Sequence, residues 1–168
     1  MDNVFTITAA IISAVGTILS VWIGHRYIKK KRVDPVVEDV AQSANVYTAL
    51  RYTMEEMGGD RAYVLQFHNG GQYYSGRGQQ KFSCTHEMTA QGVSRECNNS
   101  QKHRVSQYHS YISELIEKDH FAYVNINEME DHAFSHLLQT AGVKSIYNVP
   151  IKTLNGKIIG ILGLDYVK

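Results

Sequence analysis

The chain has 168 residues, with 17 Lys and Arg against 16 Asp and Glu, so its formal charge is only +1. Five of the basic residues gather between positions 26 and 32, and removing them together with Asp2 leaves 12 basic and 15 acidic residues in the rest of the chain. Nucleic-acid binding is therefore not expected, because it needs basic residues spread over the fold. A chain of this length has room for one domain besides a membrane anchor.

An uncharged stretch near the N-terminus predicts a membrane span. Residues 4–24 contain no ionisable side chain, and a helix of that length is roughly 30 Å long, which matches the hydrocarbon core of a bilayer. A secretory signal peptide would carry its positive charges before the apolar run, and a buried core helix is seldom uncharged on every face. We therefore predict an N-terminus and transmembrane helix over residues 1–25, in a single-pass protein of the inner cell membrane.

A basic juxtamembrane collar over residues 26–34 follows the predicted span. Because cationic residues tend to stay on the cytoplasmic side, we expect the domain that follows, residues 35–168, to be cytoplasmic. Each cation also favours anionic lipid by roughly 1 kcal/mol. The residues predicted to lie at the membrane surface are Trp22, Arg26, Lys29, Lys30, Lys31 and Arg32.

Small residues line one face of the predicted span. Ser13, Gly16, Ser20 and Gly24 recur at three- and four-residue spacing. Helices in lipid associate through close backbone approach and hydroxyl hydrogen bonds, which such a face permits. We therefore predict that the anchor self-associates and that the protein is a homo-oligomer; the alternative is that small residues are simply common in spans.

The rest of the chain alternates helical and strand patterns. Asp34 and Pro35 predict the start of an amphipathic helix over 35–57, which Gly58 and Gly59 end. This leading helix could transmit motion from the membrane, pair with a copy of itself, or pack on the sheet of its own domain. The other predicted elements are strands over 61–67, 81–88, 121–126, 143–151 and 157–166 and helices over 106–118 and 128–141.

Turn chemistry and internal glycines give further predictions. The pairs Asn69-Gly70 and Asn155-Gly156 favour tight turns. The polar segment 92–103 fits a lid over a pocket and a plain surface excursion equally well. Gly160 and Gly163 lie inside the last predicted strand, where glycine weakens packing, so we expect a side chain or a ligand to approach the backbone closely there.

No catalytic or metal-binding pattern is present in the sequence. It lacks a GxSxG motif and a Walker glycine loop. Glu128, Glu130 and Asp131 stand where a helix starts, so helix capping is expected of them. His132 and His136 share a helical face without the glutamate of an HExxH motif, which predicts a solvated face. We therefore predict a non-enzyme without a metal site and leave any cofactor unknown.

Two cysteines occur in the chain, Cys84 and Cys97. In a reducing cytoplasm the default is two free thiols. Thirteen residues of separation are compatible with a disulfide, so whether they pair stays open.

The C-terminal stretch VKSIYNVPIKTLNGKIIGILGLDY, residues 143–166, resembles the closing hairpin of GAF domains. Those commonly show a glycine, a strand ending in Val-Pro-Ile, an Asn-Gly or Asp-Gly turn and a strand containing Ile-Gly-Ile-Leu. The order of predicted helices and strands over 36–168 is also similar to that family. The resemblance implies an α/β (α+β) fold of the GAF/PAS type, with a central antiparallel sheet flanked by helices. It further implies a sensory or regulatory module for a small-molecule or protein ligand.

The same resemblance implies a ligand pocket between the sheet and the middle helices. The residues that it implies there are Phe67, His68, Asn69, Phe82, Cys84, Tyr123 and Asn125. Tyr73 and Tyr74 are added as candidates, although they fit a core or an interface equally well. The chain lacks the Asn-Lys-x-Asp motif of cyclic-nucleotide-binding members and a cysteine in a tetrapyrrole-attachment context. The GAF-fold methionine sulfoxide reductases would need a low-pKa thiolate with a resolving partner, and His86 is the one activating neighbour that Cys84 has in sequence.

The stretch NGGQYYS, residues 69–75, is similar to an N-G-x-x-Y-Y-S segment of the T-type holins of T-even bacteriophages. A short N-terminus, one span and a compact C-terminal domain match that family's layout. This resemblance implies a phage lysis protein that oligomerises through its helix and permeabilises the inner membrane. Holin domains face the periplasm, whereas the charges at 26–32 argue for a cytoplasmic domain. A membrane scaffold for protein interaction is a third alternative.

Overall fold

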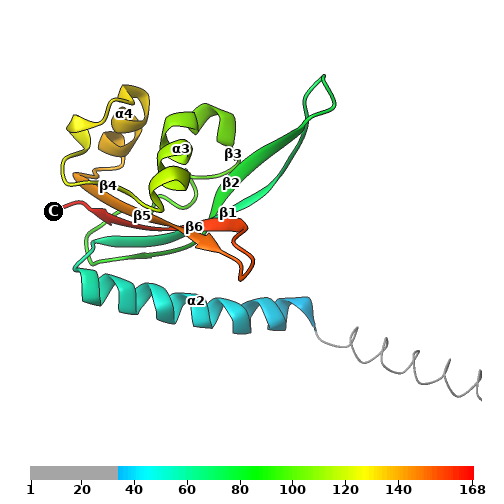
Figure 1. Ribbon diagram of the computed structural model, residues 1–168. Helices are drawn as coiled ribbons and strands as arrows, with labels where there is room; N and C mark the ends of the chain where they lie inside the picture. Colours follow the sequence, from blue (N-terminus) through cyan, green and yellow to red (C-terminus); the bar gives the residue numbers. More distant parts are fainter. Residues whose placement is uncertain (1–33) are drawn as a thin grey trace, which may run out of the picture. The chain divides into compact units, whose positions relative to one another are not determined.

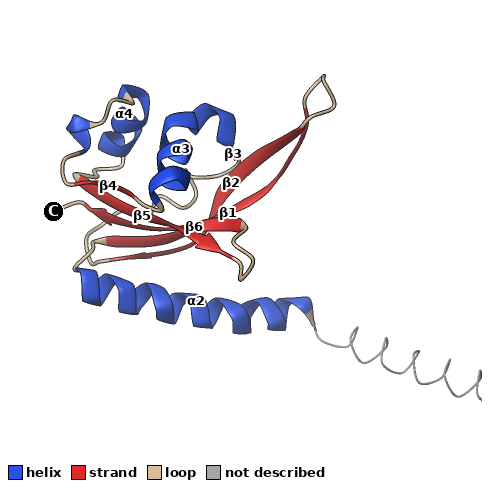
Figure 2. Cartoon of the chain, in the orientation of Figure 1, coloured by secondary structure: helices blue, strands red, loops and turns tan. Residues whose placement is uncertain are grey.

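The computed structural model describes residues 34–168. The predicted transmembrane helix, its small-residue face and the basic residues up to Arg32 fall outside that range. Within residues 34–168, every helix is too short or too polar to cross a membrane. What the structure describes is a mixed fold of helices and one six-stranded antiparallel sheet (Figures 1 and 2).

The leading helix α2 (Pro35–Met57) has the bounds that its sequence predicts. The Asp34 carboxylate accepts a hydrogen bond from the backbone N–H of Val36 at 2.9 Å, and Gly58 follows the last turn with φ +65°. Residues 43–168 form one compact unit. In this unit Leu50 of α2 is buried against the sheet, so the Ser43–Met57 half of the helix packs on its own domain.

The sheet has the spatial order β3-β2-β1-β6-β5-β4, and each neighbouring pair is antiparallel. Its strands are β1 (Arg61–Gln72), β2 (Gly78–Thr89), β3 (His103–Arg104), β4 (Phe121–Tyr123), β5 (Ser145–Lys152) and β6 (Ile158–Tyr166). Successive side chains of β1 point to opposite faces, as the alternating pattern predicts: Ala62 and Val64 lie in the core cluster with Leu50 of α2, and Leu65 lies in the larger cluster on the other face.

The remaining helices cover the face opposite the Ser43–Met57 half of α2 (Figure 1). They are the 3-10 helix η1 (Val105–Tyr108), α3 (His109–Lys118), the 3-10 helix η2 (Ile126–Glu128) and α4 (His132–Thr140). Tyr111 and Leu115 of α3 and Leu138 of α4 are buried here with Leu65 and Ile161 of the sheet. This face therefore carries the main core of the domain.

The first hairpin differs from its prediction. The Asn69-Gly70 pair lies within β1, which continues to Gln72, and the turn is made by residues 73–77. Asn69 pairs with Gln80 and Gln72 pairs with Gly78, so β1 holds one extra residue here, and Gly71 takes φ +96°. The conformational freedom of this glycine therefore serves a β-bulge and not a tight turn.

The middle of the domain also differs in its boundaries. The strand predicted over 121–126 ends at Tyr123, and the helix predicted over 128–141 begins at His132. Asp131 is the N-cap, since its carboxylate accepts a hydrogen bond from the backbone N–H of Phe134 at 3.0 Å. The capping role expected of Asp131 is thus confirmed, and Glu128 belongs to η2.

Close approach at the glycines of β6 is confirmed. A Cβ placed on Gly160 would lie 2.6 Å from the carbonyl oxygen of Leu65, and one on Gly163 would overlap the ring of Tyr63. The approaching groups are therefore a backbone carbonyl and an aromatic side chain of the neighbouring strand. Gly156 takes φ +81° in the turn before β6, as the Asn-Gly chemistry predicts.

A second bulge lies in the middle of β2. Val64 pairs with His86 whereas Leu65 pairs with Cys84, so Thr85 is an extra residue between the two pairs. Because each strand residue alternates faces, the extra residue inverts the alternation that follows it. Cys84 consequently lies on the face covered by α3 and α4, whereas the His86 side chain contacts Ser43 of α2 at 3.1 Å. Glu87, the next residue of β2, lies again on the face covered by α3 and α4.

Candidate functional site

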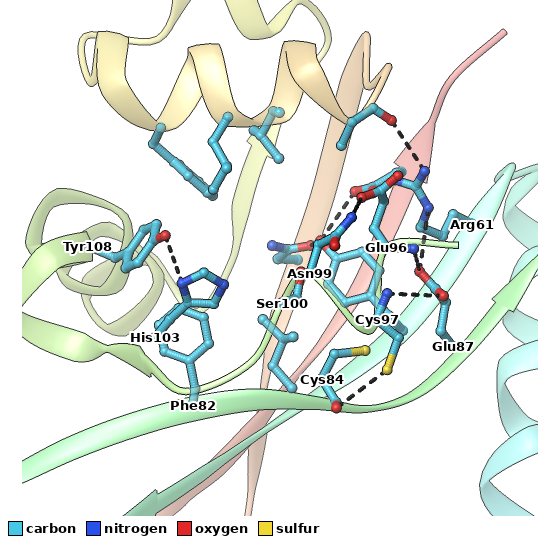
Figure 3. A pocket seen from close by; sticks show the side chains of 18 of the residues that line it. Arg61, Phe82, Cys84, Glu87, Glu96, Cys97, Asn99, Ser100, His103 and Tyr108 are labelled. Carbon is cyan, nitrogen blue, oxygen red and sulfur yellow. Dashed lines mark hydrogen bonds and ion pairs between the residues drawn. The ribbon is translucent and has the colours of Figure 1, made fainter. Parts of the chain in front are cut away.

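A cavity of about 280 Å³ lies between the sheet and the helices α3 and α4. Its walls are mostly apolar and come from distant parts of the chain (Figure 3). The strands contribute Tyr63, Leu65, Phe82, Cys84 and Asn148, and the helices contribute Tyr108, Tyr111, Phe134, Leu137 and Leu138. A packed core leaves few voids larger than one water molecule, so a space of this size is a candidate ligand site.

A buried ionic cluster forms one end of the cavity. The Arg61 guanidinium lies 2.8 Å from the Asp165 carboxylate and 3.6 Å from that of Glu87, and all three side chains are at most 5% exposed. Arg61 also donates hydrogen bonds to the backbone carbonyl oxygens of Ser94 at 3.1 Å and Ala141 at 3.2 Å. All three nitrogens of the guanidinium therefore bond within the protein.

Burial governs the ionisation of this cluster. Removal from water raises the pKa of Asp165 to about 6, although Arg61 beside it acts in the opposite direction. Two carboxylates thus share one guanidinium, and the cluster is short of positive charge. A buried ion pair adds little to the net free energy of folding. We therefore regard this cluster as fixing the positions of its three side chains.

A polar network continues from the ionic cluster along the floor of the cavity. The Tyr63 hydroxyl lies 3.2 Å from Asp165 and 3.1 Å from the side-chain oxygen of Asn148, and the Asn148 amide donates to the Tyr111 hydroxyl at 2.7 Å. Burial raises the pKa values of both tyrosines, so both phenols are neutral and able to donate a hydrogen bond near neutral pH.

The segment 90–102 closes one side of the cavity. The Glu87 carboxylate accepts hydrogen bonds from the backbone N–H groups of Glu96 at 2.8 Å and Cys97 at 3.2 Å. The backbone N–H of Cys84 donates to the Ser100 carbonyl at 2.7 Å. Glu96, Cys97, Asn99 and Ser100 line the cavity. Of the two alternatives that the sequence left open, the structure therefore favours a covering segment, fixed to the ionic cluster, over a plain surface excursion.

Cys84 and Cys97 are both free thiols, and they meet at the cavity wall. The Cys97 thiol donates to the Cys84 carbonyl oxygen at 3.4 Å. Burial, and then the neighbouring Cys97, raise the pKa of the Cys84 thiol. A reactive thiolate needs a lowered pKa, so this geometry offers Cys84 no role as a nucleophile. Cys97 is partly exposed and is the more accessible of the two.

Aromatic rings form the wall at the other end of the cavity. The Tyr108 hydroxyl lies 3.0 Å from Nδ1 of His103, and burial lowers the pKa of that histidine. The Tyr108 ring packs edge-on against Phe82 at 5.3 Å and against Phe134 at 5.6 Å. Because His103 is neutral at pH 7, it adds no positive charge to the cavity.

Two of the nine candidate ligand residues, Phe82 and Cys84, line this cavity. Five others are engaged elsewhere: Phe67 packs against the main core, His68 contacts Ser83, the Tyr73 hydroxyl contacts Ser106, the Tyr123 hydroxyl donates to Glu114, and Asn125 caps η2. Asn69 pairs with Gln80, and Tyr74 is fully exposed in the turn between β1 and β2.

His132 and His136 are exposed on α4, and in residues 34–168 no group of three or more potential ligands could hold a metal ion.

Several cavity residues could not be found from the sequence by composition or motif. Three cavity residues, Arg61, Tyr63 and Asp165, stand in predicted strands. The one feature of the sequence that could have identified them is a charged residue beside a pattern of core residues. Glu87 faces the cavity because of the bulge at Thr85, which the alternating pattern does not show. Asn148 sits between apolar neighbours in β5 and resembles an ordinary strand residue.

Comparison with solved structures shows the same fold in several proteins. The PixJ GAF domain of Thermosynechococcus elongatus, in its blue-light absorbing form, matches with a TM-score of 0.56 and 15% identity over 72% of this chain and 66% of that one. The GAF domain region of a putative membrane protein from Geobacter sulfurreducens PCA matches with a TM-score of 0.54 and 13% identity, over 80% of this chain and 82% of that one.

A third structure, Staphylococcus aureus NreA mutated in its nitrate binding site, matches with a TM-score of 0.55 and 9% identity over 77% of this chain and 88% of that one. No family model matches the sequence, and no curated protein matches it. At these identities the likeness shows the fold alone. The predicted GAF-like α+β fold is thereby confirmed.

Proposed function

We propose that this protein is a membrane-anchored sensory module, in which the GAF-like domain binds a small molecule and passes that state to an oligomerising transmembrane helix. The observation that supports this most directly is the cavity between the sheet and α3 and α4. It is lined by residues from β1, β2, β5, β6 and both helices, so a molecule bound there would touch most of the domain. The function requires no catalytic residue, and we propose that the domain is not an enzyme.

The size of the cavity limits its occupant. A volume of about 280 Å³ is close to the lower end of the range of about 300–1,000 Å³ for ligand sites. In our proposal the ligand is therefore a compact molecule, of the size of a small metabolite.

A short path joins the cavity to the leading helix. Arg61 is separated from the end of α2 by Gly58, Gly59 and Asp60 alone. The junction is held by hydrogen bonds from the Tyr166 hydroxyl to the Met57 carbonyl at 3.1 Å and from the backbone N–H of Val167 to the Asp60 carboxylate at 2.8 Å. A ligand that shifts Arg61 would act on the end of α2 directly, and in our proposal this is how the bound state reaches the membrane.

Filling the cavity tests ligand binding. In Ser100→Phe a ring replaces a cavity-lining hydroxymethyl group, whereas in Asn98→Phe the same ring is placed on an exposed residue of the same segment outside the cavity. The full chain is purified from cells without refolding, denatured, and the released small molecules are identified by mass spectrometry. We expect a compound that wild type and Asn98→Phe release and Ser100→Phe does not. Equal release from all three chains would contradict the proposal.

Anchoring and orientation are tested with the accessible thiol. Cys97 is partly exposed whereas Cys84 is buried, so a membrane-impermeant maleimide should label Cys97 first. If the domain is cytoplasmic, we expect labelling in lysed bacteria and protection in intact spheroplasts, with Cys97→Ser as the control for specificity. Labelling of intact spheroplasts would show the opposite orientation, and the holin-like alternative would then take precedence. Recovery in the soluble fraction would contradict the anchor itself.

A further inference from the structure

The residues around the cavity carry an excess of negative charge. Arg61 is the one lysine or arginine among the described residues that line it, and Glu87, Glu96 and Asp165 are three carboxyl groups. Arg61 is already engaged by two of these carboxylates and by the carbonyls of Ser94 and Ala141. An anionic ligand would therefore find no free cation and two net negative charges. A cationic ligand would relieve that imbalance.

The aromatic wall favours the same kind of ligand. Phe82, Tyr108, Tyr111 and Phe134 all line the cavity, and their rings are linked by centroid distances of 4.7 to 5.6 Å. Rings grouped in this way bind ammonium and quaternary ammonium groups through their negative faces, and more strongly when water is excluded. Both the carboxylates and the rings therefore attract a cation.

A buried hydroxyl supplies the third feature. The Tyr111 side chain is 2% exposed and lines the cavity, and its oxygen accepts a hydrogen bond from Asn148 at 2.7 Å. Among residues 34–168 it donates to no acceptor. A phenol can donate one hydrogen bond, and leaving a buried donor unused is unfavourable. A ligand oxygen within reach of Tyr111 would satisfy it.

We infer that the cavity selects a small organic cation, a quaternary or protonated amine that also carries a hydroxyl or carbonyl oxygen. The cationic group lies against the aromatic wall, the ligand oxygen accepts from Tyr111, and the carboxylates at the opposite end of the cavity add a negative potential. This inference rests on the proposed ligand-binding function and specifies the class of its ligand. It excludes inorganic anions and carboxylates of similar size.

Three probes of one shape test the charge selectivity. Choline carries a quaternary ammonium and a hydroxyl; its uncharged analogue dimethylbutanol replaces the nitrogen with carbon; dimethylbutanoate is the corresponding anion. Each is titrated calorimetrically into the full chain in a non-ionic detergent. We expect choline to bind roughly tenfold more tightly than the alcohol, and the anion to show no binding. Ser100→Phe should abolish choline binding, which assigns it to the cavity.

A variant at the rim separates charge from shape. Glu96→Gln keeps the acceptor for the Asn99 amide, which now lies 2.8 Å away, but removes one charge from the cavity. We expect it to weaken choline binding roughly fivefold and to leave binding of the alcohol unchanged. Glu117→Gln, on an exposed residue of α3 outside the cavity, should change neither.

The outcomes distinguish this inference from the function on which it rests. Tighter or equal binding of the alcohol or the anion, or no binding of choline, overturns the cation selectivity. The same holds if Glu96→Gln and Glu117→Gln bind choline alike. The proposed ligand-binding function fails separately, if Ser100→Phe releases the same small molecules as wild type.

Discussion

Replacing Arg61 with methionine is expected to lower the free energy of unfolding by about 3–5 kcal/mol, because it leaves buried carboxylates without their cation. Asp165 and Glu87 lie 2.8 and 3.6 Å from the guanidinium, and both are almost completely buried. The segment 90–102 also loses its bond from Arg61 to the Ser94 carbonyl. We therefore expect the cavity wall to loosen together with the loss of stability.

The pH dependence provides a signature of this cluster. In the wild type the folded pKa of Asp165 is about 6, above the value of 3.8 for an exposed Asp. Folding then favours the protonated form, so its contribution to stability is greatest below pH 4 and is lost as the pH rises to about 6. The size of this loss is about 3 kcal/mol. In Arg61→Met the loss should extend to higher pH, and Asp165→Asn should abolish it.

Urea unfolding of the full chain, followed by circular dichroism in non-ionic detergent from pH 4 to pH 8, checks both statements. Arg95→Met is the matched control, because Arg95 is an exposed arginine of the same covering segment outside the cavity lining. We expect the control to change stability by less than about 0.5 kcal/mol. An Arg61→Met chain as stable as the control at pH 7 would show that the cluster is solvated.

Gly163→Ala is expected to lower the free energy of unfolding by about 3 kcal/mol, at the upper end for overpacking. A Cβ at this position would overlap the Tyr63 ring and lie 2.6 Å from the side-chain oxygen of Asn148. Asn148 is buried and Tyr63 is partly buried, and both belong to the polar network of the cavity, so neither can move without breaking hydrogen bonds to Asp165 or Tyr111. The substitution should therefore also abolish choline binding.

Gly78→Ala tests whether the steric overlap is the cause. Gly78 is also a strand glycine, but an added Cβ there would meet no atom within 4 Å. We expect this variant to keep its stability or gain up to about 1 kcal/mol, since alanine loses less conformational entropy than glycine on folding. Urea unfolding and choline titration of the two alanine variants give the comparison. Equal stabilities would show that β6 and β1 move apart to accept the methyl group.

The sequence predicts those parts of the fold that depend on local patterns. The helix over 35–57 has sharp start and stop signals, and its bounds agree with the structure. The alternation around Val64 correctly separates the two faces of β1. The start of α4 was predicted too early because two acidic residues both fit the start of a helix. Asp131 is the N-cap of α4, whereas Glu128 lies in the preceding 3-10 helix η2.

The cavity was much harder to predict because its residues come together only through the tertiary fold. Arg61 and Asp165 are 104 positions apart and meet because β1 pairs with β6. The resemblance to GAF domains directed attention to the end of the first strand, yet the cavity lies nearer its start, at Arg61, Tyr63 and Leu65. Phe82 and Cys84, which the resemblance to GAF domains implied as pocket residues of the second strand, do line the cavity.

The extra residue at Thr85 determines how sequences of this kind can be aligned and how they can diverge. Loss of Thr85 would not shorten a loop; it would restore regular alternation and leave the pairs Val64–His86 and Leu65–Cys84 in place, so Glu87 would still face the cavity. Loss of the bulge without loss of a residue would instead turn Glu87 toward α2 and His86 toward the cavity. Relatives that lack one residue here are therefore expected to keep both the fold and the acidic wall of the cavity.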